Sequence, residues 1–136
     1  MLLFLKNISP FISAIICGLI LFQSAIIAPS INNLLPAEHA STYLRYIWPK
    51  FFIIISVLTI FSLITIYTLN SNQNFAKIVS LLSLIFMLIC YFIIPVMNNA
   101  RDSANDSLFF ILHSISIGLT IITLVLNLLL FIKWKF

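Results

Sequence analysis

Four long stretches without a charged side chain divide this 136-residue sequence. They are bounded by Lys6 and Glu38, Lys50 and Lys77, Lys77 and Arg101, and Asp106 and Lys133. Each stretch holds about 20 or more largely apolar residues, enough for an α-helix rising ~1.5 Å per residue to cross the ~30 Å hydrocarbon core of a bilayer. The sequence therefore predicts four transmembrane helices, near residues 10–30, 49–69, 77–97 and 107–133.

The composition excludes the other fold classes. Only 7% of the residues are charged and 62% are hydrophobic, which is too little charge to cover the surface of a soluble domain. A mean hydropathy of +1.21 is also far from the polar composition of disordered chains. A β-barrel is disfavoured because apolar runs such as Phe51–Ile55 do not alternate with polar residues. We expect an all-α integral membrane protein, a four-helix bundle.

The distribution of basic residues predicts the orientation of the chain. With four spans, both termini lie on one side, together with Lys6, Lys77, Lys133 and Lys135 and no acidic residue. The other side carries three basic residues and all three acids. This bias favours termini in the cytoplasm, and the lysines suit a leaflet of anionic lipid. We expect a multi-pass protein of the bacterial inner (cytoplasmic) membrane, with the lipid bilayer as its surroundings.

A short repeat links the two halves of the sequence. Pro29-Ser30-Ile31-Asn32-Asn33 and Pro95-Val96-Met97-Asn98-Asn99 share the pattern Pro-x-(Ile/Met)-Asn-Asn, about half the chain apart. We interpret this as a duplication of residues 1–69 in 70–136, which predicts two helix hairpins of like orientation. Each proline frees a carbonyl that needs a partner in lipid. The alternative is that Pro-x-x-Asn merely ends the helix in a turn.

The fourth span carries a stripe of polar side chains on one helical face. Its members, separated by three, four or seven positions, are Asp106, His113, Ser116, Thr120, Thr123 and Asn127. This spacing keeps them on one side of a packed helix, which must face other helices or a wet crevice. The first span offers small and polar residues, including Ser13, Cys17 and Gly18, so we expect these two helices to pack together.

His113 is the only imidazole within a predicted span. An ionisable group at that depth is a functional-site hypothesis by default, and it could hold a proton, a metal or a haem-like ligand. The alternative is a structural histidine bonded to Asn32, Asn98 or a freed carbonyl. Arg101 is expected to pair with Asp102, Asp106 or Glu38, or to bind an anion.

These residues converge on the outer side of the membrane and define a candidate binding site. Its predicted members are Asn32, Asn98, Asn99, Arg101, Asp106, His113 and Ser116, with Pro29 and Pro95 breaking the helices beside it. No catalytic residue, metal or cofactor is assigned, because the sequence lacks a phosphate-binding glycine loop, paired histidine ligands, and a nucleophile beside a base.

Three functions are consistent with this pattern. The first is a binding or transport-related module for a small anion, a metal or protons, completed by a homo-oligomer or a larger membrane complex. The second is a haem-, metal- or quinone-linked redox protein, and the third is a structural or assembly subunit without a site of its own. Nucleic-acid binding is excluded because the net charge of +4 is scattered over both membrane faces.

Several motifs together resemble a known family. They are Gly18-Leu19-Ile20-Leu21-Phe22, Trp48-Pro49-Lys50-Phe51-Phe52, Pro95 with Arg101 six positions later, and Leu112-His113-x-x-Ser116. From Gly18 to about Asn127 the chain resembles the domain of unknown function 4149 and its eukaryotic relatives, the transmembrane protein 205-like family. The resemblance implies that Pro29, Pro95, Arg101, His113 and Ser116 match marked positions of a family without an established activity.

Overall fold

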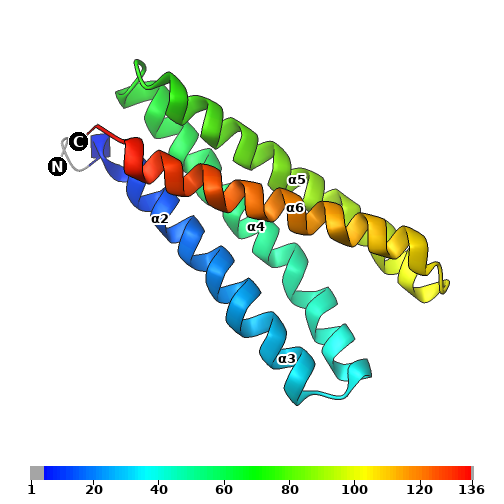
Figure 1. The fold of residues 1–136 in the computed structure, drawn as a ribbon. Helices are drawn as coiled ribbons and strands as arrows, with labels where there is room; N and C mark the ends of the chain where they lie inside the picture. The colour runs from blue at the N-terminus through cyan, green and yellow to red at the C-terminus, as the bar shows by residue number, and fades with distance from the viewer. Residues whose placement is uncertain (1–4, 136) are drawn as a thin grey trace.

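The computed structural model describes residues 5–135, which form four helical rods (Figure 1). The first rod is made of α2 (Ile8–Leu21), the π-helical η1 (Phe22–Ile27) and α3 (Ala28–Leu34); the others are α4 (Ala37–Leu69), α5 (Asn74–Asp102) and α6 (Asp106–Lys133). The described residues contain no strand, and each rod is long and apolar enough to cross a membrane. The predicted all-α fold is confirmed, and the chain is an integral, multi-pass membrane protein.

The helices extend beyond the stretches predicted to cross the hydrocarbon. α4 begins at Ala37, although the second predicted span starts at Pro49, and α5 continues past Met97 to Asp102. Pro49 and Pro95 therefore lie inside helices, and Pro-x-x-Asn does not end the third helix in a turn. A proline removes one backbone donor only, and near the membrane surface water can bind the carbonyl that it frees.

The rods form two antiparallel hairpins, α2–α3 with α4 and α5 with α6 (Figure 1). α4 packs along α5, and α6 packs against α2, as predicted for the first and fourth spans. The N- and C-terminal ends of the described chain lie side by side (Figure 1), and we call this the terminal end. The opposite end, with the connections at residues 35–36 and 103–105, is the far end.

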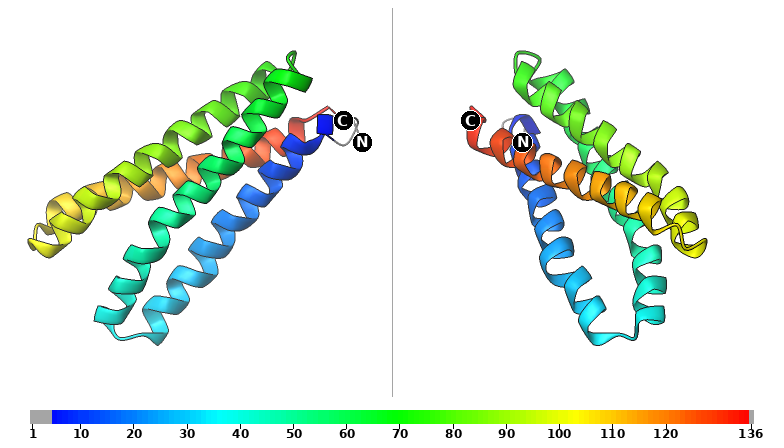
Figure 2. Two further views of the ribbon diagram at one scale, coloured as in Figure 1. Left: turned by 180° about the vertical axis from the view of Figure 1, so that it is seen from behind. Right: turned by 45° about the vertical axis from the view of Figure 1, so that its right-hand side comes forward.

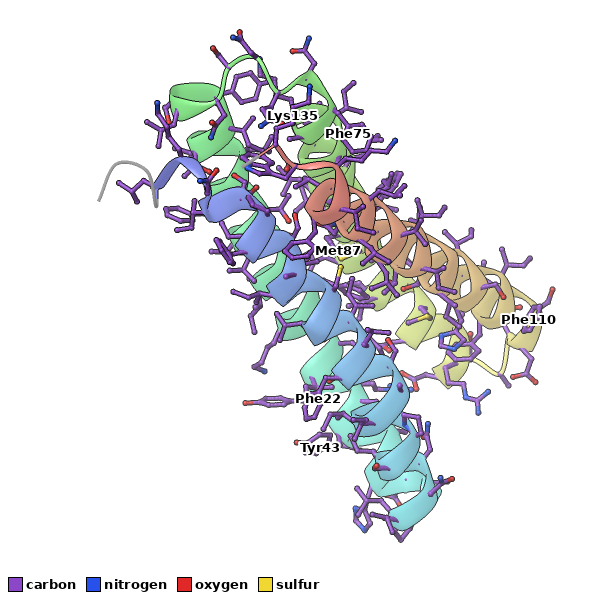
Figure 3. All side chains as sticks on the ribbon, turned by 60° about the vertical axis from the view of Figure 1, so that its left-hand side comes forward. Phe22, Tyr43, Phe75, Met87, Phe110 and Lys135 are labelled. Carbon is purple, nitrogen blue, oxygen red and sulfur yellow. The ribbon has the colours of Figure 1, made fainter. Side chains whose placement is uncertain are left out.

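The two hairpins diverge toward the far end. α3 contacts η1 and α4 but neither α5 nor α6, and all views show the two far-end connections well apart (Figure 2). The helices converge instead around a central apolar cluster that includes Ile16, Ile55, Met87 and Cys90, all almost fully buried. Met87 lies among the helices, whereas Phe22 and Phe110 point outward (Figure 3), as expected for side chains that face lipid.

Small polar side chains fill much of the interior of the bundle. Ser9 and Thr65 hydroxyls lie 2.9 Å apart, and Asn127 Nδ2 donates to Ser83 Oγ over 2.9 Å. Further cross-links near the terminal end join Ser62 to Ser80, Asn70 to the carbonyl of Lys6, and Trp134 to Asn7. Hydrogen bonds between helices hold membrane bundles together because lipid offers no polar partner. The terminal end is therefore closely bonded.

Candidate functional site

Arg101, Phe109 and His113 form a column of side chains at the far end of the second hairpin. The His113 ring stacks on the Phe109 ring with centroids 5.5 Å apart and planes inclined by 11°. The Arg101 guanidinium lies 4.9 Å from the Phe109 centroid, a distance typical of a cation–π contact. The column lies on the outside of the single chain, with His113 and Arg101 both exposed.

Local sequence explains how this column is built. Ala104 takes a left-handed conformation with φ of 55°, which turns the chain sharply between α5 and α6. Asn105 then caps α6 by accepting a hydrogen bond from Leu108 N over 3.2 Å. Phe109 and His113 follow at a spacing of four residues, which places them on one helical face.

His113 has no hydrogen-bond partner among residues 5–135. The alternative of a structural bond to Asn32, Asn98 or a carbonyl freed by proline is therefore not found in the described chain. An imidazole carries two nitrogens that donate or accept hydrogen bonds, and leaving them unsatisfied in an apolar layer is costly. The ring is thus available to a group from outside the chain.

Arg101 pairs with Asp106, one of the three acids predicted as its partners. The closest approach is 3.5 Å, between Arg101 Nη1 and Asp106 Oδ1, and the two side chains are 56% and 82% exposed. Such an exposed and long ion pair contributes little to stability. Arg101 can therefore exchange Asp106 for another anion.

The remaining predicted residues lie in three different places. Asn98 and Asn99 are on the last turns of α5, at the same end as Arg101. Asn32 is on α3, which does not approach α5 or α6, so the structure does not bring it to the others. Ser116 is buried below His113, and its carbonyl accepts the Thr120 hydroxyl over 2.8 Å.

A second arginine, which the sequence pattern did not predict for the site, makes the stronger ion pair. Arg45 on α4 donates to both carboxylate oxygens of Asp102, over 2.6 and 3.0 Å. Both residues lie outside the predicted crossing stretches 49–69 and 77–97. The hydrogen bonds and charge of Arg45 lower the pKa of the Asp102 carboxyl below its ordinary value.

Pro29 stands just after a π-helical segment instead of ending the first rod. Ala28 N–H bonds to Gln23 O, five residues back, and Pro29 follows at the start of α3. Short π-helical segments within α-helices are frequent at functional sites. Gln23 is 6% exposed, and its Nε2 has no hydrogen-bond partner among residues 5–135.

Gln23 was also missed at the sequence level, although a signal for it exists. Ile16, Ile20 and Gln23 follow at helical spacing, so the buried face of the first rod continues into the glutamine. Gln23 lies on the first hairpin, apart from the Arg101–His113 column.

The described residues contain no group of three or more His, Cys, Asp or Glu side chains that could hold a metal ion. Cys17 and Cys90 are both free and buried. Cys90 Sγ donates to the carbonyl of Ser116 over 3.8 Å, and Cys17 Sγ to that of Leu124 over 3.6 Å. Both thiols therefore serve contacts between helices.

Comparison with known proteins supports the family resemblance. No curated protein matches the chain, and no solved structure does. A family model described as "Domain of unknown function (DUF4149)" matches residues 11–106. The match includes Pro29, Pro95 and Arg101, whereas His113 and Ser116 lie beyond its end. Because this match covers more than half of the sequence, the chain belongs to the domain of unknown function 4149 family.

Proposed function

We propose that the chain is a membrane binding or transport-related module whose site lies at the far end of the second hairpin and takes a small anionic group. Arg101 supplies a permanent positive charge, His113 supplies an N–H donor, and Phe109 holds both side chains in one column. The observation that supports this most strongly is the imidazole of His113, which stacks on Phe109 but has no hydrogen-bond partner in residues 5–135.

The neighbouring residues have supporting roles in this proposal. Asp106 pairs with Arg101 in the absence of a bound anion, because its carboxylate lies 3.5 Å from the guanidinium. Asn98 and Asn99 offer amide donors at the same end. Asn32 would join the site only from another copy of the chain, since its own hairpin diverges from the second one.

Histidine NMR spectroscopy tests the proposal directly. His39 is the only other histidine, so His39→Gln leaves His113 as the single labelled ring in detergent micelles. Sodium phosphate and sodium acetate, added at constant ionic strength, are the probe anions. We expect at least one of them to shift the His113 resonance in a saturable manner, and Arg101→Gln to weaken that binding about tenfold.

Lys50→Gln is the matched control, because it removes a positive charge on the same side of the membrane from the other hairpin. It should leave the affinity unchanged. The proposal fails if neither anion shifts the resonance. It also fails if the two substitutions weaken binding equally, since that result indicates general charge screening instead of a site.

We further propose that the chain lies in a bacterial inner membrane with its terminal end in the cytoplasm. The support is the Lys/Arg bias of that side. With both native cysteines replaced by alanine, Ser71→Cys at the terminal end and Ser103→Cys at the far end report the orientation. An impermeant maleimide added to intact spheroplasts should label the Ser103→Cys variant alone, and the reverse pattern would overturn this orientation.

A further inference from the structure

A cavity of about 640 Å³ opens at the terminal end, between the start of α5 and the end of α6. Phe75 and Lys135, both in its lining, lie close together at that end (Figure 3). The Arg101–His113 column lies at the opposite end of the same hairpin. The cavity is therefore separate from the site proposed above.

The cavity lining has an apolar part and a polar part. Ala76, Leu130 and Trp134 are nearly fully buried, and Phe75 continues the apolar surface. Lys133, Lys135 and the amide side chains of residues 72–74 supply positive charge and hydrogen-bond donors. A ligand that fits this lining has an anionic head joined to an apolar body.

The position of its walls is fixed by contacts on both sides. Trp134 Nε1 donates to Asn7 Oδ1 over 3.1 Å, which ties the end of α6 to the start of the first rod. Lys133 Nζ lies 5.1 Å from the centroid of the Phe75 ring, so one lysine already stands over the apolar part. The cavity therefore lies between α5 and α6, with the end of α6 bonded to the start of the first rod.

Charge at this end is unbalanced. The three acidic residues of the sequence are Glu38, Asp102 and Asp106, and all lie at the far end. Arg45 and Arg101 already engage two of them. Within residues 5–135, no carboxylate side chain lies at the terminal end to neutralise Lys133 or Lys135.

We propose that this cavity binds the phosphate headgroup of an anionic phospholipid. The phosphate lies between Lys133 and Lys135, the amides of residues 72–74 bind headgroup oxygens, and the acyl chains follow the apolar surface of α5 and α6. A soluble phosphate would use the lysines but leave the apolar lining uncovered, whereas a lipid covers both. Each lysine near an anionic membrane surface increases the affinity for that surface severalfold.

The fluorescence of Trp134, which lines the cavity, can be used to measure this binding. Trp48 is the only other tryptophan and packs on Phe51 and Phe52, with ring centroids 5.4 and 5.7 Å away, so Trp48→Phe removes its signal conservatively. The variant is placed in phosphatidylcholine nanodiscs that contain small equal fractions of either brominated phosphatidylglycerol or brominated phosphatidylcholine. Bromine quenches tryptophan fluorescence only at short range.

We expect brominated phosphatidylglycerol to quench Trp134 at a lower mole fraction than brominated phosphatidylcholine, by roughly tenfold. Lys133→Gln with Lys135→Gln should abolish this selectivity. Lys6→Gln with Lys77→Gln removes the same charge from the same end but from outside the cavity lining, and it should leave most of the selectivity intact. Circular dichroism confirms that both double variants are folded.

Two results would overturn the proposal. Equal quenching by the two lipids excludes a headgroup site. Equal loss of selectivity in both double variants shows that the lysines act only as a diffuse surface charge. Inorganic phosphate at millimolar concentration should not displace the brominated lipid, and displacement would identify a soluble anion as the ligand instead.

Discussion

Arg45 on α4 binds Asp102 at the end of α5 through two hydrogen bonds, of 2.6 and 3.0 Å. This ion pair joins the two hairpins close to the end where they diverge. Paired hydrogen bonds of this kind are directional as well as strong. The pair therefore links the two hairpins at a defined point near the far end.

Replacing Arg45 should loosen this connection. We expect Arg45→Gln to lower the thermal unfolding temperature in detergent by a few degrees, because α4 and α5 lose their charged link near the far end. The exchanged pair, Arg45→Asp with Asp102→Arg, should restore most of the loss. Circular dichroism during heating measures both, and Arg101→Gln, which breaks a longer and more exposed pair, should have a smaller effect. Failure of the exchanged pair to recover would show that the charges are not coupled.

The same pair predicts a pH dependence. Arg45 lowers the pKa of Asp102 in the folded chain, so the pair stabilises the fold above the ordinary carboxyl pKa of about 4. That stabilisation should disappear as the pH falls through the lowered pKa of the folded state. We therefore expect the difference in unfolding temperature between the parent and Arg45→Gln to be constant from about pH 5 to 7. It should shrink below about pH 4, where Asp102 becomes protonated. A difference that grows on acidification would contradict this assignment.

The hydrogen bond from Asn127 to Ser83 should contribute measurably to the bundle. Both side chains are buried, and Asn127 Nδ2 also donates to Thr123 O over 2.9 Å. A double-mutant cycle with Asn127→Ala and Ser83→Ala should give a coupling of ~0.6–1.7 kcal/mol, the range found for bonds between membrane helices. Unfolding in mixed micelles with a denaturing detergent measures it. Asn99→Ala, an exposed position, serves as the control and should change the stability little.

Gln23 should be a destabilising residue in the isolated chain. Its Nε2 is buried and has no hydrogen-bond partner in the described part of the chain, which costs ~1–3 kcal/mol relative to a satisfied or apolar group. Gln23→Met keeps the length of the side chain and removes the amide, so we expect the free energy of unfolding to rise by about that amount. A fall in stability instead would mean that the amide has a partner from outside the described chain, such as a water or a lipid.

The turn between α5 and α6 carries a smaller, local strain. Ala104 has φ of 55°, a conformation that costs an L-residue roughly 1–2 kcal/mol and glycine almost nothing. Ala104→Gly should raise the free energy of unfolding by about 0.5–1 kcal/mol, allowing for the greater freedom of glycine in the unfolded chain. Ala100→Gly, inside α5, should lower it by about 1 kcal/mol. Equal changes at the two positions would contradict the strain.

The helices were predictable because each is defined locally. Four uncharged stretches are long enough to cross a bilayer, and the spacing of polar residues on α6 placed Ser116, Thr120, Thr123 and Asn127 on a buried face. The same spacing was wrong for Asp106 and His113, which are exposed because α6 leaves the other hairpin toward the far end. The same spacing argument would have found Ser62, Thr65, Ser80 and Ser83 on α4 and α5. The sequence therefore also contains a polar face on the second and third spans. It is less evident there because most of the neighbouring residues are apolar.

The relation between the hairpins was not predictable, because it depends on how long helices cross. The pairing of Arg45 with Asp102 requires that α4 and α5 stay close at the far end, while α3 separates from α6. No local pattern contains that information. For the same reason, a site shared by Asn32 and His113 stays a prediction, and it would require two copies of the chain. Arg101, Asp106 and His113 lie at the same end because they are close in the sequence. The internal repeat also stays a prediction.

The divergence of the hairpins has a consequence for the surrounding bilayer. A body whose rods are bonded together at one end and spread at the other displaces unequal areas of the two leaflets. Lipid tails have room between the hairpins at the far end, whereas near the terminal end the buried Ser62–Ser80 contact holds α4 against α5. Such a tapered molecule is expected to favour membranes of matching curvature, independently of any ligand.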